Sequence, residues 1–395
     1  MSKVRVLLCA TALGGAIVGT LSSAFAQEER NDQLARTVVS TSATIKPGDV
    51  VVISGGRHTI PLMEAVAIEA QKAGGMVTMF LTTDRVVRSF NADVPEKYLD
   101  QAPRFLAEWL KHVDVFIGLP NVEDPQASIA GVPEARFAKA AKAGEVVSNI
   151  LNASPVRGVF IGYPSSQEAA ANRLDFATYE KMHWDGIAAD YNQISEKGKT
   201  LRNALKGVKS VRITSPNGTD FTFSVGNRPI FVDDGIITPE KAKSKLIFVR
   251  TVTLPTGQVF FAPIETSANG KVVVPKNQCR YAPLTETSFE FKNGKMENFK
   301  AKDGLDCFNE TMTPYSGPKD ILGFVSIGLN PALKVIEDGG DYRPGNAAGM
   351  VWIGTGQNEL YGGNNKPPGG FGFPIVKSTV QVDGKTVVKD GELTL

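Results

Sequence analysis

The sequence predicts two joined parts: an α/β domain built on a parallel sheet with flanking helices, and a mainly antiparallel β domain. Apolar, strand-like runs alternate with helical segments from residue 49 to about residue 203, and this order implies a parallel sheet covered by helices. Helical periodicity disappears from Val208 onward, where short apolar runs are separated by turns rich in Gly and Pro. A chain of 395 residues also exceeds what one hydrophobic core usually supports.

Composition excludes two broad classes of protein. The hydrophobic fraction of 42% and the small net charge exclude a mainly disordered chain. The 43 Lys and Arg residues are balanced by 41 Asp and Glu residues, so no nucleic-acid partner is expected from bulk charge. Three His and three Cys residues leave few of the usual ligands for a transition metal.

The N-terminus is typical of a secretory signal peptide. Lys3 and Arg5 precede a mostly apolar run over residues 6–21, and Ala24-Phe25-Ala26 matches a cleavage site. The apolar run is short for a bilayer span, so we expect no stable membrane anchor. The sequence therefore predicts residues 1–26 as a signal peptide, residues 27–206 as the α/β domain with bridging helices, and residues 207–395 as the β-rich domain of a periplasmic or secreted protein.

The elements of the α/β domain follow one another in a regular order. An apolar strand over residues 50–53 ends at Ser54-Gly55-Gly56; Thr59 and Pro61 suit the start of a helix that stops at Gly74. Strands are predicted over residues 76–81, 113–119 and 156–161, and helices over residues 98–111 and 133–143. Residues 169–206 are predicted to form one or two longer helices that bridge the domains.

The β-rich domain begins with a hairpin. Residues 210–214 and 219–225 flank the turn Pro216-Asn217-Gly218, and a second hairpin turns at Asp383-Gly384. Further strands are predicted over residues 245–252, 257–262, 271–274, 288–291, 325–328, 350–355 and 375–382.

Cysteine usage predicts one disulfide. Removal of the signal peptide leaves Cys279 and Cys307, and an exported chain meets an oxidising compartment. We therefore expect the two residues to pair, rather than to supply a catalytic thiol.

Two segments of the α/β domain carry residues that could bind ligands. Arg57 and His58 follow the first strand and precede a helix, where ligands of α/β proteins often bind, although the glycines before them could simply form a turn. The segment lacks the glycine patterns of nucleotide-binding loops. His183 and Asp185 stand two residues apart on a predicted helix, so their side chains should point to nearly opposite sides and cannot clasp one metal ion.

Two segments of the β domain carry further candidates. Glu265 follows an apolar strand and Pro263, where it could serve a site, cap a turn or pair with a cation. Tyr361 is the aromatic residue with acid–base chemistry in a long polar loop over residues 354–370. Loops of this length are uncommon unless they are functional or disordered.

Several stretches, in order, resemble the M29 metallo-aminopeptidases of the aminopeptidase T type. They are residues 215–224, Asp233-Asp234-Gly235, residues 255–270, residues 328–331 and residues 382–392, and residues 61–74 resemble the first helix of the family. The resemblance covers roughly residues 34–395. It implies an aminopeptidase T-like two-domain enzyme that removes N-terminal residues from peptides, and it is compatible with a homodimer. It also implies two divalent ions, zinc or cobalt, which Glu, His and Asp hold to activate water.

The ligands that the resemblance implies are mostly replaced. Glu265 matches the first Glu ligand, and Tyr361 could correspond to the catalytic Tyr. The remaining ligand positions carry residues whose side chains offer no atom to bind a metal ion: Phe324, Trp352, Gly372 and Pro374. Phe373 lies between the last two. One carboxylate cannot hold a two-metal site. Related dihydroxypyridine dioxygenases need His and Asp for iron and are disfavoured by the same replacements.

Three hypotheses on function remain open. The first is an exported aminopeptidase-like hydrolase whose ligands have moved to His58, Glu265 or the acids Asp233 and Asp234. The second is a metal-free relative that binds a peptide or a small apolar or aromatic molecule, with Glu265 and Tyr361 as polar anchors. In this second hypothesis the lining residues are Phe324, Trp352 and Phe373. The third is a metal-independent enzyme of other chemistry. The residues themselves predict no cofactor.

Overall fold

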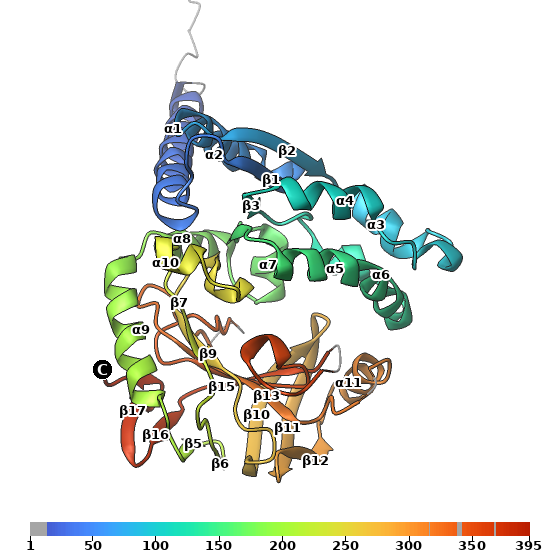
Figure 1. Ribbon diagram of the computed structural model, residues 1–395, viewed down its shortest axis with the longest axis vertical. Coiled ribbons are helices and arrows are strands. Elements are labelled where there is room, and N and C mark those ends of the chain that lie inside the picture. Colours follow the sequence, from blue (N-terminus) through green and yellow to red (C-terminus); the bar gives the residue numbers. More distant parts are fainter. Residues whose placement is uncertain (1–13, 316, 338–341, 367–368) are drawn as a thin grey trace, which may run out of the picture.

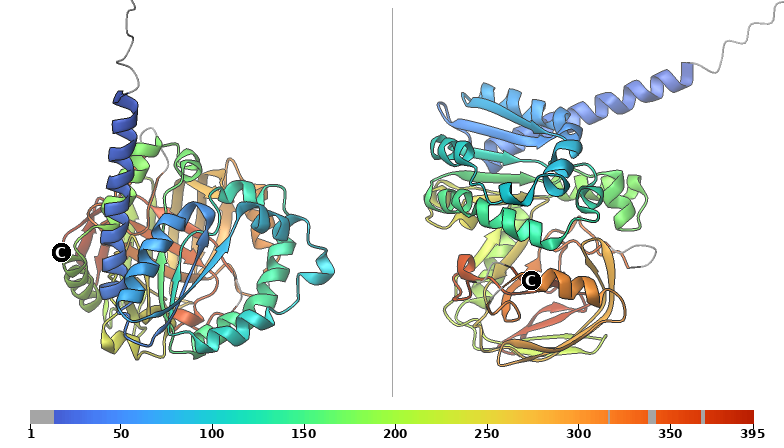
Figure 2. Two further views of the ribbon diagram at one scale, coloured as in Figure 1. Left: turned by 90° about the horizontal axis from the view of Figure 1, so that it is seen from above. Right: turned by 90° about the vertical axis from the view of Figure 1, so that its right-hand side faces the viewer.

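The computed structural model describes residues 14–395 except 316, 338–341 and 367–368. The α/β part lies above the β part in Figure 1. Helix α1 (Gly14–Thr37) projects from the body at its N-terminal end (Figure 2) and runs through the predicted cleavage point after Ala26. The charged start of the predicted signal peptide lies outside the described residues. Within the part of the chain that is described, no helix is long and apolar enough to cross a membrane.

The α/β part contains a five-stranded parallel sheet, as the alternating elements predict. Its order is β2-β1-β3-β4-β8, and all four pairings are parallel. The strands are β1 (Val50–Gly56), β2 (Met76–Thr82), β3 (Val115–Gly118), β4 (Arg157–Ile161) and β8 (Thr251–Leu254).

The fifth strand corrects one prediction. The strand expected over residues 245–252 is instead a 3-10 turn, η5 (Ile247–Val249), followed by β8. Strand β8 pairs with β4 in the α/β sheet, where Val252 and Leu254 are buried. The chain therefore returns to the first sheet after entering the β part, and the local sequence does not reveal which sheet a short apolar strand joins.

The helices differ from prediction where caps and prolines act. The helix expected over residues 98–111 is broken before Arg104, because Pro103 disfavours a helical conformation at the residue before it, and its last turn is a 3-10 turn. Asp175 and Asp190 each cap the N-terminus of a new helix. Residues 169–206 therefore contain the end of one helix followed by two complete helices. The helices of this part after α1 are the π-helical turn η1 (Val38–Ser42), η2 (Arg57–Thr59), α2 (Ile60–Lys72), α3 (Asp84–Ala92), η3 (Glu96–Tyr98), α4 (Arg104–Trp109), η4 (Leu110–His112), α5 (Pro125–Ile129), α6 (Glu134–Ala153), α7 (Ser166–Ala171), α8 (Phe176–Ile187) and α9 (Tyr191–Leu205).

The β part contains two antiparallel sheets, ordered β12-β11-β10-β6-β5-β16-β17-β18 and β15-β14-β13-β9-β7. Both predicted hairpins are present, but the strand expected over residues 375–382 is split between the two sheets as β15 and β16. The strands are β5 (Val211–Ser215), β6 (Thr219–Phe223), β7 (Ile230–Asp233), β9 (Gln258–Phe261), β10 (Asn269–Cys279), β11 (Ala282–Lys292), β12 (Lys295–Lys300), β13 (Leu322–Gly328), β14 (Val351–Thr355), β15 (Gly372–Ile375), β16 (Thr379–Val382), β17 (Lys385–Lys389) and β18 (Glu392–Leu393).

Three short helices belong to the β part: α10 (Pro239–Ala242), α11 (Leu305–Met312) and η6 (Glu359–Tyr361). The end of β10 is joined to α11 by a disulfide between Cys279 and Cys307, which confirms the predicted pairing.

Candidate functional site

One face of the five-stranded antiparallel sheet carries the positions that the resemblance gives to metal ligands. Trp352 pairs with Ser326 on one side and Pro374 on the other, and Gly354 pairs with Phe324 and Gly372. Because side chains alternate along a strand, these positions share one face. The other face packs in the core.

The pairing also places Phe373 outside the predicted site. Phe373 pairs with Ile353, it is fully buried, and its ring centroid lies 4.7 Å from that of Phe289 in the larger sheet. Since neighbouring residues of a strand point to opposite faces, Phe373 is a core residue and does not line the same surface as Trp352.

Glu265 is held by a closed set of donors. Arg228 Nη2 lies 2.5 Å from Glu265 Oε2, and Oε1 accepts hydrogen bonds from Asn358 Nδ2 at 3.0 Å and from the Asn364 backbone N–H at 2.6 Å. The two charged side chains are only 13% and 17% exposed. Burial raises the pKa of Glu265, but the hydrogen bonds and the Arg228 charge outweigh it and hold the pKa below its ordinary value. Arg228 Nη1 also donates to the Gly362 carbonyl, so this network fixes the long loop.

Tyr361 lies in that loop and joins an aromatic cluster. Its ring stacks on Phe248 with centroids 4.8 Å apart and packs against Phe260 and Phe324. Burial raises the pKa of the Tyr361 hydroxyl. Phe324 and Tyr361 therefore pack against each other. Glu265 contacts the same loop directly through Asn358 and the Asn364 N–H, and indirectly through Arg228 and Gly362.

Around Trp352 the same sheet face is hollow. A cavity of about 400 Å³ is lined by Trp352 and Pro374, together with Asn172 from the α/β part and Asn277 from β10. A Cβ atom on Gly372 would lie 3.3 Å from Trp352 Cζ3, and one on Gly345 would lie 3.3 Å from Cδ1. Glycine at both positions leaves the rim of the indole uncrowded. The structure thus brings Trp352, Gly372 and Pro374 together as one cavity wall.

These residues do not fit the two-metal centre that the resemblance implies. Both carboxylate oxygens of Glu265 already accept charge-assisted or amide hydrogen bonds, and Phe, Trp, Gly and Pro side chains offer no ligand atom. Among the described residues, no group of three or more His, Cys, Asp or Glu side chains is arranged to hold a metal ion.

The candidates of the α/β part lie at the carboxyl edge of the parallel sheet. His58 belongs to η2, directly after β1, and its ring packs edge-on against Tyr163 with centroids 5.8 Å apart. Both of its ring nitrogens are buried, and neither has a hydrogen-bond partner in the described structure. Burial lowers the pKa of His58, and the charges of Glu123 and Asp84 partly oppose this. Arg57 is exposed.

His183 and Asp185 point apart, as the helical spacing predicts. His183 is buried and its pKa is lowered to about 4 by burial, whereas Asp185 is exposed and pairs with Lys181 at 2.5 Å.

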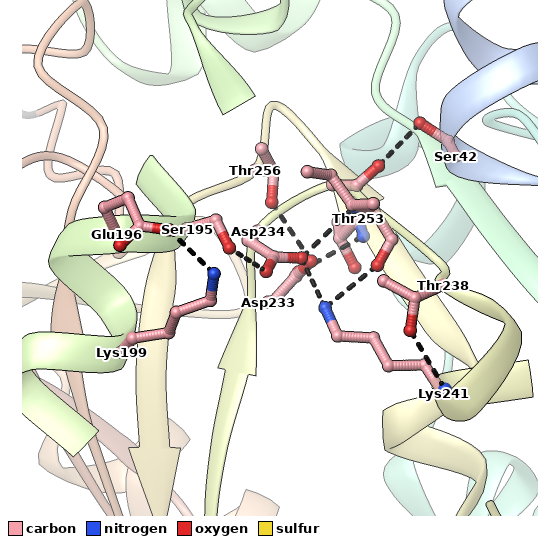
Figure 3. Close-up of polar contacts among 12 residues, drawn as sticks. Ser42, Ser195, Glu196, Lys199, Asp233, Asp234, Thr238, Lys241, Thr253 and Thr256 are labelled. Carbon is pink, nitrogen blue, oxygen red and sulfur yellow. Dashed lines mark hydrogen bonds and ion pairs between the residues drawn. The ribbon is translucent and has the colours of Figure 1, made fainter. Parts of the chain in front are cut away.

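Asp233 and Asp234 form a buried polar network at the junction of the two parts (Figure 3). Asp233 accepts hydrogen bonds from the Thr253 backbone N–H at 3.2 Å and from Thr256 Oγ1 at 3.0 Å. Burial, reinforced by the charge of Asp234, raises the pKa of Asp233 to about 7 against these bonds. Thr253 belongs to β8 of the parallel sheet, so this carboxyl group joins the two parts of the molecule.

Asp234 is equally committed to structure. It accepts hydrogen bonds from Ser195 Oγ on α9 at 2.9 Å and from Lys241 Nζ on α10 at 2.5 Å. The two acids therefore hold elements together, and they are not available as replacement ligands for a metal ion.

Sequence reasoning missed Arg228. It stands in a short turn, Gly226-Asn227-Arg228-Pro229, 37 residues before Glu265, and no local pattern marks it as the partner of that carboxylate.

Comparisons with known proteins agree on the fold. The family model of the thermophilic metalloproteases (M29) matches residues 27–332. The structure is similar to that of wild-type AmpT from Thermus thermophilus, with a TM-score of 0.73 and 16% identity over 93% of this chain and 99% of that one. It is also similar to a 2,5-dihydroxypyridine dioxygenase from Pseudomonas putida KT2440, with a TM-score of 0.59 and 16% identity over 93% of this chain and 97% of that one. No curated protein sequence matches the chain.

Proposed function

The chain belongs to the M29 family of thermophilic metalloproteases, and we propose that it is a metal-independent binding protein rather than an aminopeptidase. The observation that carries this proposal is the ion pair between Arg228 and Glu265, the one carboxylate that matches a family ligand. Arg228 places a fixed positive charge 2.5 Å from that carboxylate. A divalent ion would have to displace the guanidinium group and the two amide donors before it could bind Glu265.

The binding surface that we propose is the cavity at Trp352. Its volume of about 400 Å³ lies within the range of small-molecule sites. Trp352, Phe371 and Pro374 supply apolar wall, and Asn172, Asn277 and Gln278 supply neutral polar groups. Tyr342 and the cationic side chain of Arg343 also line the cavity. This combination suits a small apolar or aromatic ligand, or the apolar end of a peptide.

We also propose that the protein acts outside the cytoplasm after cleavage behind Ala26. Ala26 is exposed, and the first buried residue of α1 whose side chain is described is Asn31. Cleavage there would keep the buried residues Asn31, Leu34 and Ala35 of α1 in the mature chain. The disulfide between Cys279 and Cys307 is consistent with an oxidising compartment.

Leucyl 4-nitroanilide tests both parts of the central proposal, because it is an aminopeptidase substrate and a quencher of indole fluorescence. We expect saturable quenching without release of nitroaniline, in the presence or absence of zinc or cobalt. Trp352→Phe should lose the quenching, and Trp109→Phe should keep it, because Trp109 lies on α4 in the α/β part.

Two results would overturn the proposal. Nitroaniline release that is abolished by a chelator and restored by metal would contradict the metal-independent assignment. Equal quenching in wild type and Trp352→Phe would contradict the assignment of the cavity.

A further inference from the structure

We propose a second binding site, for a neutral aromatic ligand, at the carboxyl edge of the parallel sheet. A cavity of about 580 Å³ lies there, and Ser54, Phe116, Gly118, Phe160, Thr253 and Asn346 are among its lining residues. It shares no lining residue with the Trp352 cavity. The two cavities are therefore separate sites.

The position of this cavity follows from the strand order. The chain passes from β1 to β2 on one side of β1, and β3 lies on the other side. The loops that follow β1 and β3 therefore diverge and leave a crevice at the ends of these strands. Ser54 of β1 pairs with Gly118 of β3, which pairs with Phe160 of β4. Open α/β sheets bind ligands at this kind of crevice.

The helices on this sheet face leave the carboxyl end of the strands open. A small apolar cluster centred on Val52, Leu110, Val113 and Val156 covers the amino-terminal part of the face. Further along β4, Phe160 is 47% exposed, although it lines a concave surface. An exposed aromatic ring inside a cavity is a surface that a ligand can cover with a gain in apolar burial.

Gly118 shapes the cavity floor. A Cβ atom at this position would lie 2.9 Å from Phe160 Cδ1, which is closer than atoms in contact can approach. The absence of a side chain lets the Phe160 ring lie across the sheet beside Phe116, with centroids 6.1 Å apart and planes tilted by 50°. The two rings thus form an aromatic wall that a third ring can extend.

The lining chemistry selects for an uncharged ligand. The described residues that line the cavity include no Asp, Glu, Lys, Arg or His, and the polar side chains among them are Ser54, Asn121, Thr253 and Asn346. A charged ligand would lose hydration here without gaining a counter-charge. A neutral ring that carries a small polar group, such as a carboxamide or a hydroxyl, could use the aromatic wall and one neutral polar partner.

Fluorine NMR with 4-fluorophenylacetamide tests this site on the full-length protein. We expect saturable broadening of the ligand signal by wild type and about tenfold weaker binding by Phe160→Ala, because a ring that covers Phe160 loses its apolar contact. Phe105→Ala is the matched control, since Phe105 is 74% exposed on α4, and it should bind as wild type does. The anion 4-fluorophenylacetate should bind at least about tenfold more weakly.

The Trp352→Phe variant separates the two cavities and should leave binding of 4-fluorophenylacetamide unchanged. Thermal unfolding of each variant shows whether it is folded, and Gly118→Ala provides a second variant that moves the Phe160 ring without removing it. Unchanged binding in folded Phe160→Ala and Gly118→Ala, loss of binding in Trp352→Phe, or equal binding of the anion would each overturn the proposal.

Discussion

Replacement of Arg228 by Met should destabilise the protein through the carboxylate that it leaves behind. Met keeps an apolar stem of similar length but removes the charge. Arg228 and Glu265 are mostly buried and 2.5 Å apart, and loss of one partner of such a pair usually costs about 3–5 kcal/mol. We expect about 2–4 kcal/mol, because Asn358 and the Asn364 N–H continue to donate to Glu265.

A double-mutant cycle isolates this effect. Glu265→Gln removes the buried charge and keeps an acceptor for the amide donors. Arg228→Met combined with Glu265→Gln should be less destabilised than the sum of the single variants, with a coupling of about 1–3 kcal/mol in urea unfolding. Proteolysis within residues 354–370 should become faster in Arg228→Met, because the Gly362 carbonyl loses its donor. Additive single effects, or an Arg228→Met variant as stable as wild type, would refute this reasoning.

Three further results are expected. Asp233→Asn should remove a pH dependence of the unfolding free energy. Burial raises the pKa of Asp233 from 3.8 to about 7, so between these values the folded state holds a proton that the unfolded chain releases. The unfolding free energy of wild type should therefore fall as pH rises from about 4 to 7. Urea unfolding at pH 5 and pH 8 measures it, and an equal fall in the variant would count against the assignment. Replacement of Cys279 and Cys307 by Ala should cost about 3.5 kcal/mol in the chain-entropy account, and thiol titration of the unreduced, unfolded wild type should detect no thiol from this pair. Intact mass of protein from the native host should correspond to a chain that begins at Gln27; a chain that retains residues 1–26 would contradict export with cleavage.

Local patterns were sufficient for most elements of the fold. The strand over residues 50–53 and the turn at Pro216-Asn217-Gly218 depend on periodicity and turn chemistry within a few residues, and both are present. The placement of β8 could not be predicted in this way. Its membership of the parallel sheet depends on a pairing with β4, about 90 residues earlier in the chain.

The site was less predictable because it depends on register and distant partners. Whether Trp352 and Phe373 share a face is decided by the pairing of β14 with β15, and a shift of one residue would reverse the answer. The state of Glu265 is set by Arg228, and the cavity at Trp352 needs Asn172 from the other part of the molecule. Neither contact leaves a signal in the neighbouring sequence.

The proposed function depends most directly on whether the protein binds catalytic metal. Calorimetric titration of chelator-free, full-length protein with zinc and with cobalt, together with elemental analysis of the purified sample, measures this. We predict neither stoichiometric binding in the titration nor retained metal in the sample, because Arg228 neutralises Glu265 and the other family positions carry no donor. One or two tightly bound equivalents, with hydrolysis of leucyl 4-nitroanilide that follows metal occupancy, would contradict the account.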